Sequence, residues 1–177
     1  MSNFDKSLEV VLAHEGGFVD NPLDRGGPTN MGITQKSLSE YCDRNRLPEA
    51  RVQDLTVTMA KALYQVQFWV PLQLYAVPDD NLATVILDLA VLRGSSALVR
   101  EIQAHLPGTA QDGVMGEQTS LLFQRFLKKA DPKKFAMDII LHEQYLMAVL
   151  AKNHPEQSTF LPGWISRTQD LLRLVCL

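Results

Sequence analysis

Apolar positions recur at helical spacing along most of the chain. Between Phe4 and Leu12 they return every three or four residues, which predicts an amphipathic helix over about 3–14. The same spacing predicts further helices over about 34–46, 56–69, 79–93, 95–106, 117–129, 132–153 and 162–176. Thr34 and Thr56 stand where a side-chain oxygen would cap the first turn of a helix. The pattern therefore predicts a mainly α fold.

Two stretches depart from this amphipathic pattern. Residues 18–34 are rich in Gly, Pro, Asn and Asp, which predicts a long ordered loop or a small β-hairpin after the first helix. Residues 82–92 are almost wholly apolar but include Asp88, and the run is too short to cross a bilayer. We therefore expect no stable membrane insertion. Because a carboxylate in an apolar helix must be paired or protonated, we expect a structural hydrogen bond at Asp88.

Composition sets the domain organisation and excludes some partners. The chain has 177 residues, of which 46% are hydrophobic and 21% charged, as in a folded protein with a real core. One domain or two small halves fit this length, and the boundary between two such halves would lie at 93–96. With a net charge of -3 and no long basic block, no nucleic acid partner is expected. We expect a monomer.

The remaining composition bears on location and cofactors. The first residues carry acids and no continuous apolar run, so we expect synthesis in the cytoplasm without a signal peptide. The two cysteines form no disulfide framework and are expected to be reduced thiols. The four histidines have no zinc-binding spacing, so neither a metal nor another cofactor is expected.

Glu15 is the residue most suggestive of chemistry. At 100° per residue it lies about 20° from Phe4 and about 20° from Leu8, on opposite sides, and so at the centre of the apolar stripe. A carboxylic acid partly removed from water can hold a proton and donate it to a leaving oxygen. Gly16 and Gly17 then leave room for a bulky substrate. The alternative is a glutamate at a helix end whose side chain turns into solvent.

The following loop offers a partner for this acid. Asp24 lies nine residues beyond Glu15, and Thr29 follows it. An inverting glycoside hydrolase needs an acid on one side of the scissile bond and a group that positions water on the other. Asp24, with the Thr29 hydroxyl, would fill the second role. The alternative is an ordinary turn with Asp at its first position.

Other side chains are candidates for substrate contact. Tyr64 and Trp69 combine an aromatic face with a polar tip, which suits a sugar ring, although such residues more often lie in a core. Thr34 lies close to the candidate loop and is a third candidate contact. Trp164 and Arg167 are expected to pack the last helix against the body of the protein.

Two motifs in the first part of the chain resemble a known family. His14-Glu15-Gly16-Gly17-Phe18 and Asp24-Arg25-Gly26-Gly27-Pro28-Thr29-Asn30-Met31-Gly32-Ile33-Thr34 look like the signature of glycoside hydrolase family 108. These are N-acetylmuramidases related to phage endolysins and to muramidases used for toxin secretion. Weaker matches follow in the family's order: Asp54-Leu55-Thr56, Tyr64, Phe68-Trp69, Pro71, Leu87 to Val91, Asp112-Gly113, Gly116, Thr119, Tyr145, Phe160, Gly163-Trp164 and Arg167.

The resemblance implies a lysozyme-like helical fold and a peptidoglycan substrate. It makes Glu15 the catalytic acid that protonates the oxygen between N-acetylmuramic acid and N-acetylglucosamine, with Asp24 and Thr29 in the second role. It implies a muramidase region over 1–94 and a closely packed peptidoglycan-binding region over 95–177. The protein would act in the periplasm or cell wall after a holin or another export factor releases it. Two alternatives remain open, namely a lytic transglycosylase using Glu15 and a non-catalytic wall-binding protein of the same fold.

Overall fold

Eight α-helices account for most of the chain that the structure describes. The computed structural model describes residues 3–20 and 27–176. Its helices are α1 (Asn3–Glu15), α2 (Gln35–Asn45), α3 (Val57–Tyr64), α4 (Asp80–Arg93), α5 (Ser95–Ala104), α6 (Glu117–Leu127), α7 (Pro132–Asn153) and α8 (Leu161–Cys176). Short 3₁₀ turns lie at Val52–Asp54, Leu74–Ala76 and Pro155–Phe160. The expected mainly α, lysozyme-like fold is confirmed.

A small antiparallel hairpin follows the first helix. Strand β1 (Thr29–Asn30) pairs with β2 (Ile33–Thr34), and Val19 forms one bridge to Thr29. Met31 and Gly32, between the strands, both have positive φ angles, of 50° and 72°, as a two-residue type I′ turn requires. The hairpin expected within 18–34 is therefore present, and it brings Gly32 to the end of α1.

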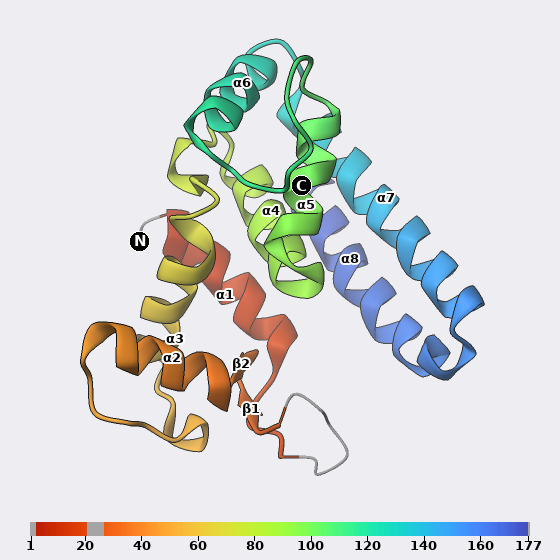
Figure 1. Ribbon diagram of the computed structural model, residues 1–177. Helices are drawn as coiled ribbons and strands as arrows, with labels where there is room; N and C mark the ends of the chain where they lie inside the picture. The colour runs from red at the N-terminus through yellow and green to blue at the C-terminus, as the bar shows by residue number, and fades with distance from the viewer. Residues whose placement is uncertain (1–2, 21–26, 177) are drawn as a thin grey trace.

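Helix α4 is the central element of the fold. Each residue from Leu82 to Ala90 is buried, which fits a helix that is apolar all round. It packs against α1 on one side and against α5, α7 and α8 on the others (Figure 1). Residues near the middle of α4 therefore face both the first helix and the last.

The second half of the chain folds back onto the first. Helices α7 and α8 run side by side as an antiparallel pair, joined by the 3₁₀ turn at Pro155–Phe160 (Figure 1). Buried apolar residues from both 1–94 and 95–177 belong to one continuous core. None of the helices in the described residues is long and apolar enough to cross a bilayer.

One predicted helix ends in a π-helical turn. The helix predicted over 56–69 is present, but it changes type along its length, because α3 ends at Tyr64 and a π-helical turn follows directly over Gln65–Trp69. The Val70 N–H donates to the Gln65 carbonyl at 2.9 Å, a spacing of five residues. An extra residue in a turn rotates the next part of the chain by about 100°. The wider turn lays the Trp69 ring against Phe4, with ring centroids 5.1 Å apart.

Substitution of Leu87 tests the central position of α4. Leu87 is wholly buried, so Leu87→Ala removes core contacts and leaves a cavity. We expect the free energy of unfolding to fall by about 2–5 kcal/mol in urea titrations followed by circular dichroism. Leu121→Ala, at a half-exposed position of α6, is the control and should change it by about 0.5 kcal/mol. Equal effects of the two substitutions would contradict the central role of α4.

Candidate active site

Glu15 is the last residue of α1, and two glycines follow it. Its side chain is 17% exposed, and Gly16, with a φ of 73°, ends the helix directly after it. A Cβ atom added at Gly16 or Gly17 would meet nothing within 4 Å. Among the described residues, nothing therefore crowds the two positions that follow Glu15, which leaves room there for a bulky substrate.

Arg167 of α8 joins Glu15 to a second carboxylate. Its Nη1 lies 2.6 Å from Glu15 Oε1, and its Nε lies 2.7 Å from Oδ1 of Asp88. Burial lowers the pKa of Arg167, but the carboxylates of Asp88 and Glu15 outweigh this effect and raise it. The guanidinium is therefore a fixed positive charge that holds one carboxylate from α1 and one from α4.

Asp88 is wholly buried and has partners on two helices. Its other oxygen, Oδ2, lies 2.7 Å from Nδ1 of His14, while Oδ1 is held by Arg167. The Nε2 atom of His14 lies 3.8 Å from Asp170 of α8. The structural hydrogen bond expected at Asp88 is thus confirmed. This pairing fixes His14, the neighbour of Glu15, and with it the end of α1.

Tyr64 and Gly32 lie against Glu15 on the side of the hairpin. The Tyr64 hydroxyl donates to the Met31 carbonyl at 2.9 Å and so holds the hairpin turn. Burial raises the pKa of Tyr64, and the Glu15 carboxylate adds to the rise while Arg167 opposes it. A Cβ atom at Gly32 would lie 2.6 Å from Glu15 Oε2. Only a glycine lets the turn approach the carboxylate this closely.

The other predicted site residues have different surroundings. The Thr29 hydroxyl donates to the Gly27 carbonyl at 3.1 Å, and the Thr34 hydroxyl caps α2 by accepting from the Ser37 N–H. Asp24 lies outside the described residues. Sugar contacts by Tyr64, which is buried beside Glu15, and by Thr34 stay predictions.

The structure places Trp69 far from Glu15. It packs against Phe4 near the start of α1, whereas Glu15 ends that helix. Glu15 stands eleven positions after Phe4 along the helix, a rise of about 17 Å. Any sugar contact by Trp69 would therefore belong to a different surface from the one beside Glu15.

Sequence reasoning missed the role of Arg167. The prediction was that it packs the last helix, but it contacts Glu15 directly. Two carboxylates at apolar helix positions require a buried cation. Arg167 stands three residues after Trp164 and four before the buried Leu171, at the edge of the apolar face of α8. Its place beside the apolar face was the sequence feature that could have identified Arg167 as a buried cation.

No cluster of three or more His, Cys, Asp or Glu placed to hold a metal occurs in the described residues. The arrangement instead offers a carboxylate beside open space on a helical scaffold, as a glycoside hydrolase requires of its general acid. Residues 8–94 match the model of the family described as glycosyl hydrolase 108. The chain belongs to the glycosyl hydrolase 108 family and is a glycoside hydrolase.

A solved structure supports this assignment over the whole chain. The structure of Brucella abortus SagA is 32% identical in sequence and matches with a TM-score of 0.73. The match covers 98% of this chain and 93% of that chain. Among curated proteins, none matches the chain significantly. The likeness therefore extends through both halves, whereas the family match is confined to the first.

Replacing Gly32 tests the close approach of the hairpin to Glu15. Gly32→Ala introduces a Cβ in a left-handed backbone conformation and against Glu15 and Tyr64. We expect a loss of about 2–4 kcal/mol in the free energy of unfolding, measured by urea denaturation. Gly17→Ala is the matched control, since an added Cβ there meets nothing within 4 Å, and it should change stability by less than about 1 kcal/mol. A neutral Gly32→Ala would refute this packing.

Proposed function

We propose that the protein is an N-acetylmuramidase. It cleaves the β-1,4 bond between N-acetylmuramic acid and N-acetylglucosamine in peptidoglycan, with Glu15 as the general acid. Membership of the glycosyl hydrolase 108 family supports peptidoglycan as the substrate. The observation that carries the residue assignment is the position of Glu15, held by Arg167 on one side and open above Gly16 and Gly17 on the other.

The two oxygens of Glu15 have different surroundings, which suggests separate tasks. Oε1 is held by the Arg167 guanidinium at 2.6 Å. Oε2 has no hydrogen-bond partner in the described part of the chain and lies on the side of the hairpin turn at Gly32. Oε2 is therefore the oxygen that carries the proton to the glycosidic oxygen, while Oε1 fixes the orientation of the carboxyl group.

Arg167 is a positioning residue for this chemistry. Its guanidinium holds Glu15 Oε1 and is itself held by the buried Asp88 carboxylate, so the core sets the direction of the Glu15 carboxyl group. We propose that Arg167 keeps Glu15 in the orientation that proton donation requires.

The second half of the reaction falls to the loop and hairpin that follow α1. We propose that Asp24 positions the attacking water and that the Thr29 hydroxyl assists it, as in an inverting mechanism. Thr29 lies on β1 of the hairpin that approaches Glu15, which supports its part in this role. Residues 1–94 would carry out this chemistry while residues 95–177 bind the wall.

Digestion of purified peptidoglycan tests the assignment of Glu15. The wild-type protein should release fragments with reducing muramic acid ends, and Glu15→Gln should release at least about 100-fold less, because general acid catalysis contributes a factor of this size. Products are identified by mass spectrometry. Glu9→Gln, on the exposed side of the same helix, is the control and should retain activity.

The products also separate the proposal from its competitors. Anhydro ends would indicate a lytic transglycosylase and overturn hydrolysis. Undiminished products from Glu15→Gln would overturn the assignment of the acid. A wild-type protein that binds peptidoglycan without releasing fragments would be the non-catalytic wall-binding protein.

Turnover tests the part played by Arg167. Arg167→Lys keeps the positive charge but loses the two-sided hydrogen bonding that orients Glu15, so we expect kcat on peptidoglycan to fall while KM changes little. Rates are measured below the melting temperature of each variant. A kcat equal to that of the wild-type protein would contradict the positioning role.

A further inference from the structure

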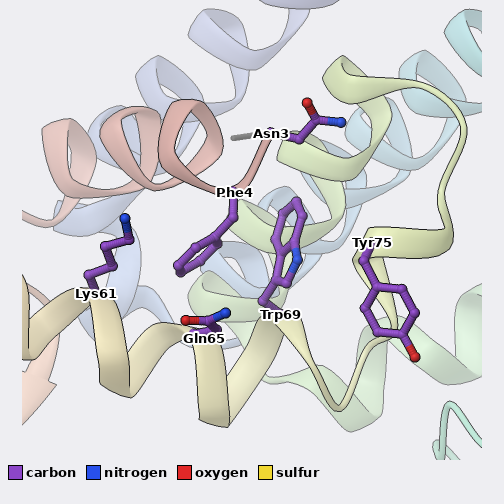
Figure 2. A pocket seen from close by; sticks show the side chains of 6 residues that line it. All are labelled: Asn3, Phe4, Lys61, Gln65, Trp69 and Tyr75. Carbon is purple, nitrogen blue, oxygen red and sulfur yellow. The ribbon is translucent and has the colours of Figure 1, made fainter. Parts of the chain in front are cut away.

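A depression at the start of α1 has the side chains of a small-molecule site (Figure 2). Its volume is about 410 Å³, within the range of roughly 300–1,000 Å³ found for ligand pockets. It is lined by Asn3, Phe4, Lys61, Gln65, Trp69 and Tyr75. The depression adjoins Phe4 and Trp69, about 17 Å along α1 from Glu15, so it is separate from the candidate active site.

Two aromatic rings form its walls, and the backbone places each of them by an unusual conformation. Trp69 is only 6% exposed and ends the π-helical turn, a feature frequent at functional sites. Tyr75, which is 66% exposed, follows Gln73, whose φ is 52°. The Gln73 side chain donates to the Met115 carbonyl at 3.0 Å and anchors this turn. The depression is thus built from fixed elements.

Three polar groups of the depression have no partner. In the described residues, the Trp69 indole N–H, the Gln65 amide and the Tyr75 hydroxyl make no hydrogen bond. In the described part of the chain, the buried side-chain nitrogen and oxygen atoms without a hydrogen bond belong to Arg93 and Glu143, so the indole N–H is not sealed in the core. Figure 2 shows the indole nitrogen on the side of Trp69 that faces Tyr75.

The remaining polar side chains are already held in place. The Asn3 amide donates to the Asp80 carboxylate, and the Lys61 ammonium pairs with Asp5. These contacts hold Asn3 and Lys61 in place, so the Trp69 indole N–H and the Gln65 amide are the polar groups of the lining that remain available to a ligand. An indole N–H at the wall of a depression is free to donate to a ligand that displaces the solvent there.

We propose that this depression binds an N-acetylhexosamine unit of a glycan strand, at a second site apart from Glu15. A sugar ring presents C–H faces to aromatic rings and carries hydroxyl and acetamido oxygens that accept from the indole N–H and the Gln65 amide. The choice of glycan rests on the proposed function. On a polymeric substrate, a second contact with the same strand raises the local concentration of glycan at the active site.

Tryptophan fluorescence provides a direct test. The chain has two tryptophans, so Trp164→Phe leaves Trp69 as the reporter. N-acetylglucosamine tetramer is the probe, and Glu15→Gln is included to prevent hydrolysis. We expect a saturable change in emission. Gln65→Ala and Tyr75→Ala, both at exposed positions, should each weaken binding by about fivefold or more, as expected for the loss of one hydrogen bond or ring contact.

Two controls keep the result specific. Val66→Ala lies in the same π-helical turn at an exposed position that does not line the depression, so it should leave the binding curve unchanged. Trp69→Phe keeps an aromatic ring but removes the indole N–H, so it should bind the tetramer more weakly. Its affinity is measured by calorimetry, and melting temperatures confirm that all variants are folded.

Failure of this site is distinguishable from failure of the proposed function. The inference is overturned if the tetramer causes no change in emission, if Gln65→Ala and Tyr75→Ala bind as the parent does, or if Val66→Ala weakens binding equally. A protein that hydrolyses peptidoglycan but shows any of these results keeps its function and loses this second site. A protein that binds the tetramer here without hydrolysing peptidoglycan loses the function and keeps the site.

Discussion

The buried carboxylate of Asp88 constrains the whole arrangement. A charge without solvent must be paired, and Asp88 obtains its partners from two other helices, His14 of α1 and Arg167 of α8. Helices α1, α4 and α8 are therefore fixed in mutual register at the level where Glu15 ends α1. Loss of Arg167 would leave an uncompensated charge in the core, which is far costlier than loss of an apolar contact. The orientation of Glu15 is in this way tied to the packing of the core.

Helix α4 carries a second ionic cluster at its C-terminal end. Arg93 pairs with Glu101 of α5, and its Nη1 lies 3.0 Å from Oε2 of Glu143 on α7. Burial raises the pKa of Glu143, the Arg93 guanidinium opposes that rise, and the Glu101 carboxylate adds to it. Such buried ion pairs determine which helices pack together, and they add little to the net stability of the fold. Between them, the two clusters connect α4 to α1, α5, α7 and α8.

Sequence patterns predicted the helices well because each buries an apolar stripe whose period is set by the helix itself. The caps at Thr34 and Thr56 were predictable for the same local reason, and both hydroxyls accept from an N–H of the first turn. The π-helical turn at Gln65–Trp69 was not predictable, since its register depends on how Trp69 meets Phe4, a contact between segments 65 residues apart. The position of Trp69 far from Glu15 follows from that turn.

The site was predictable only in part, for a related reason. Glu15 stood out because it lies on the apolar face of its helix, and that face is visible from the neighbouring positions of the same helix. Arg167 did not, because its partners lie 152 and 79 positions away and no local pattern joins them. The division of the chain at residue 94, read from the sequence, separates Arg167 from both carboxylates that it binds. Whatever residues 95–177 contribute to wall binding, their last helix also supplies the charge nearest to Glu15. The orientation of the candidate acid is therefore a property of the folded whole and not of the first 94 residues alone.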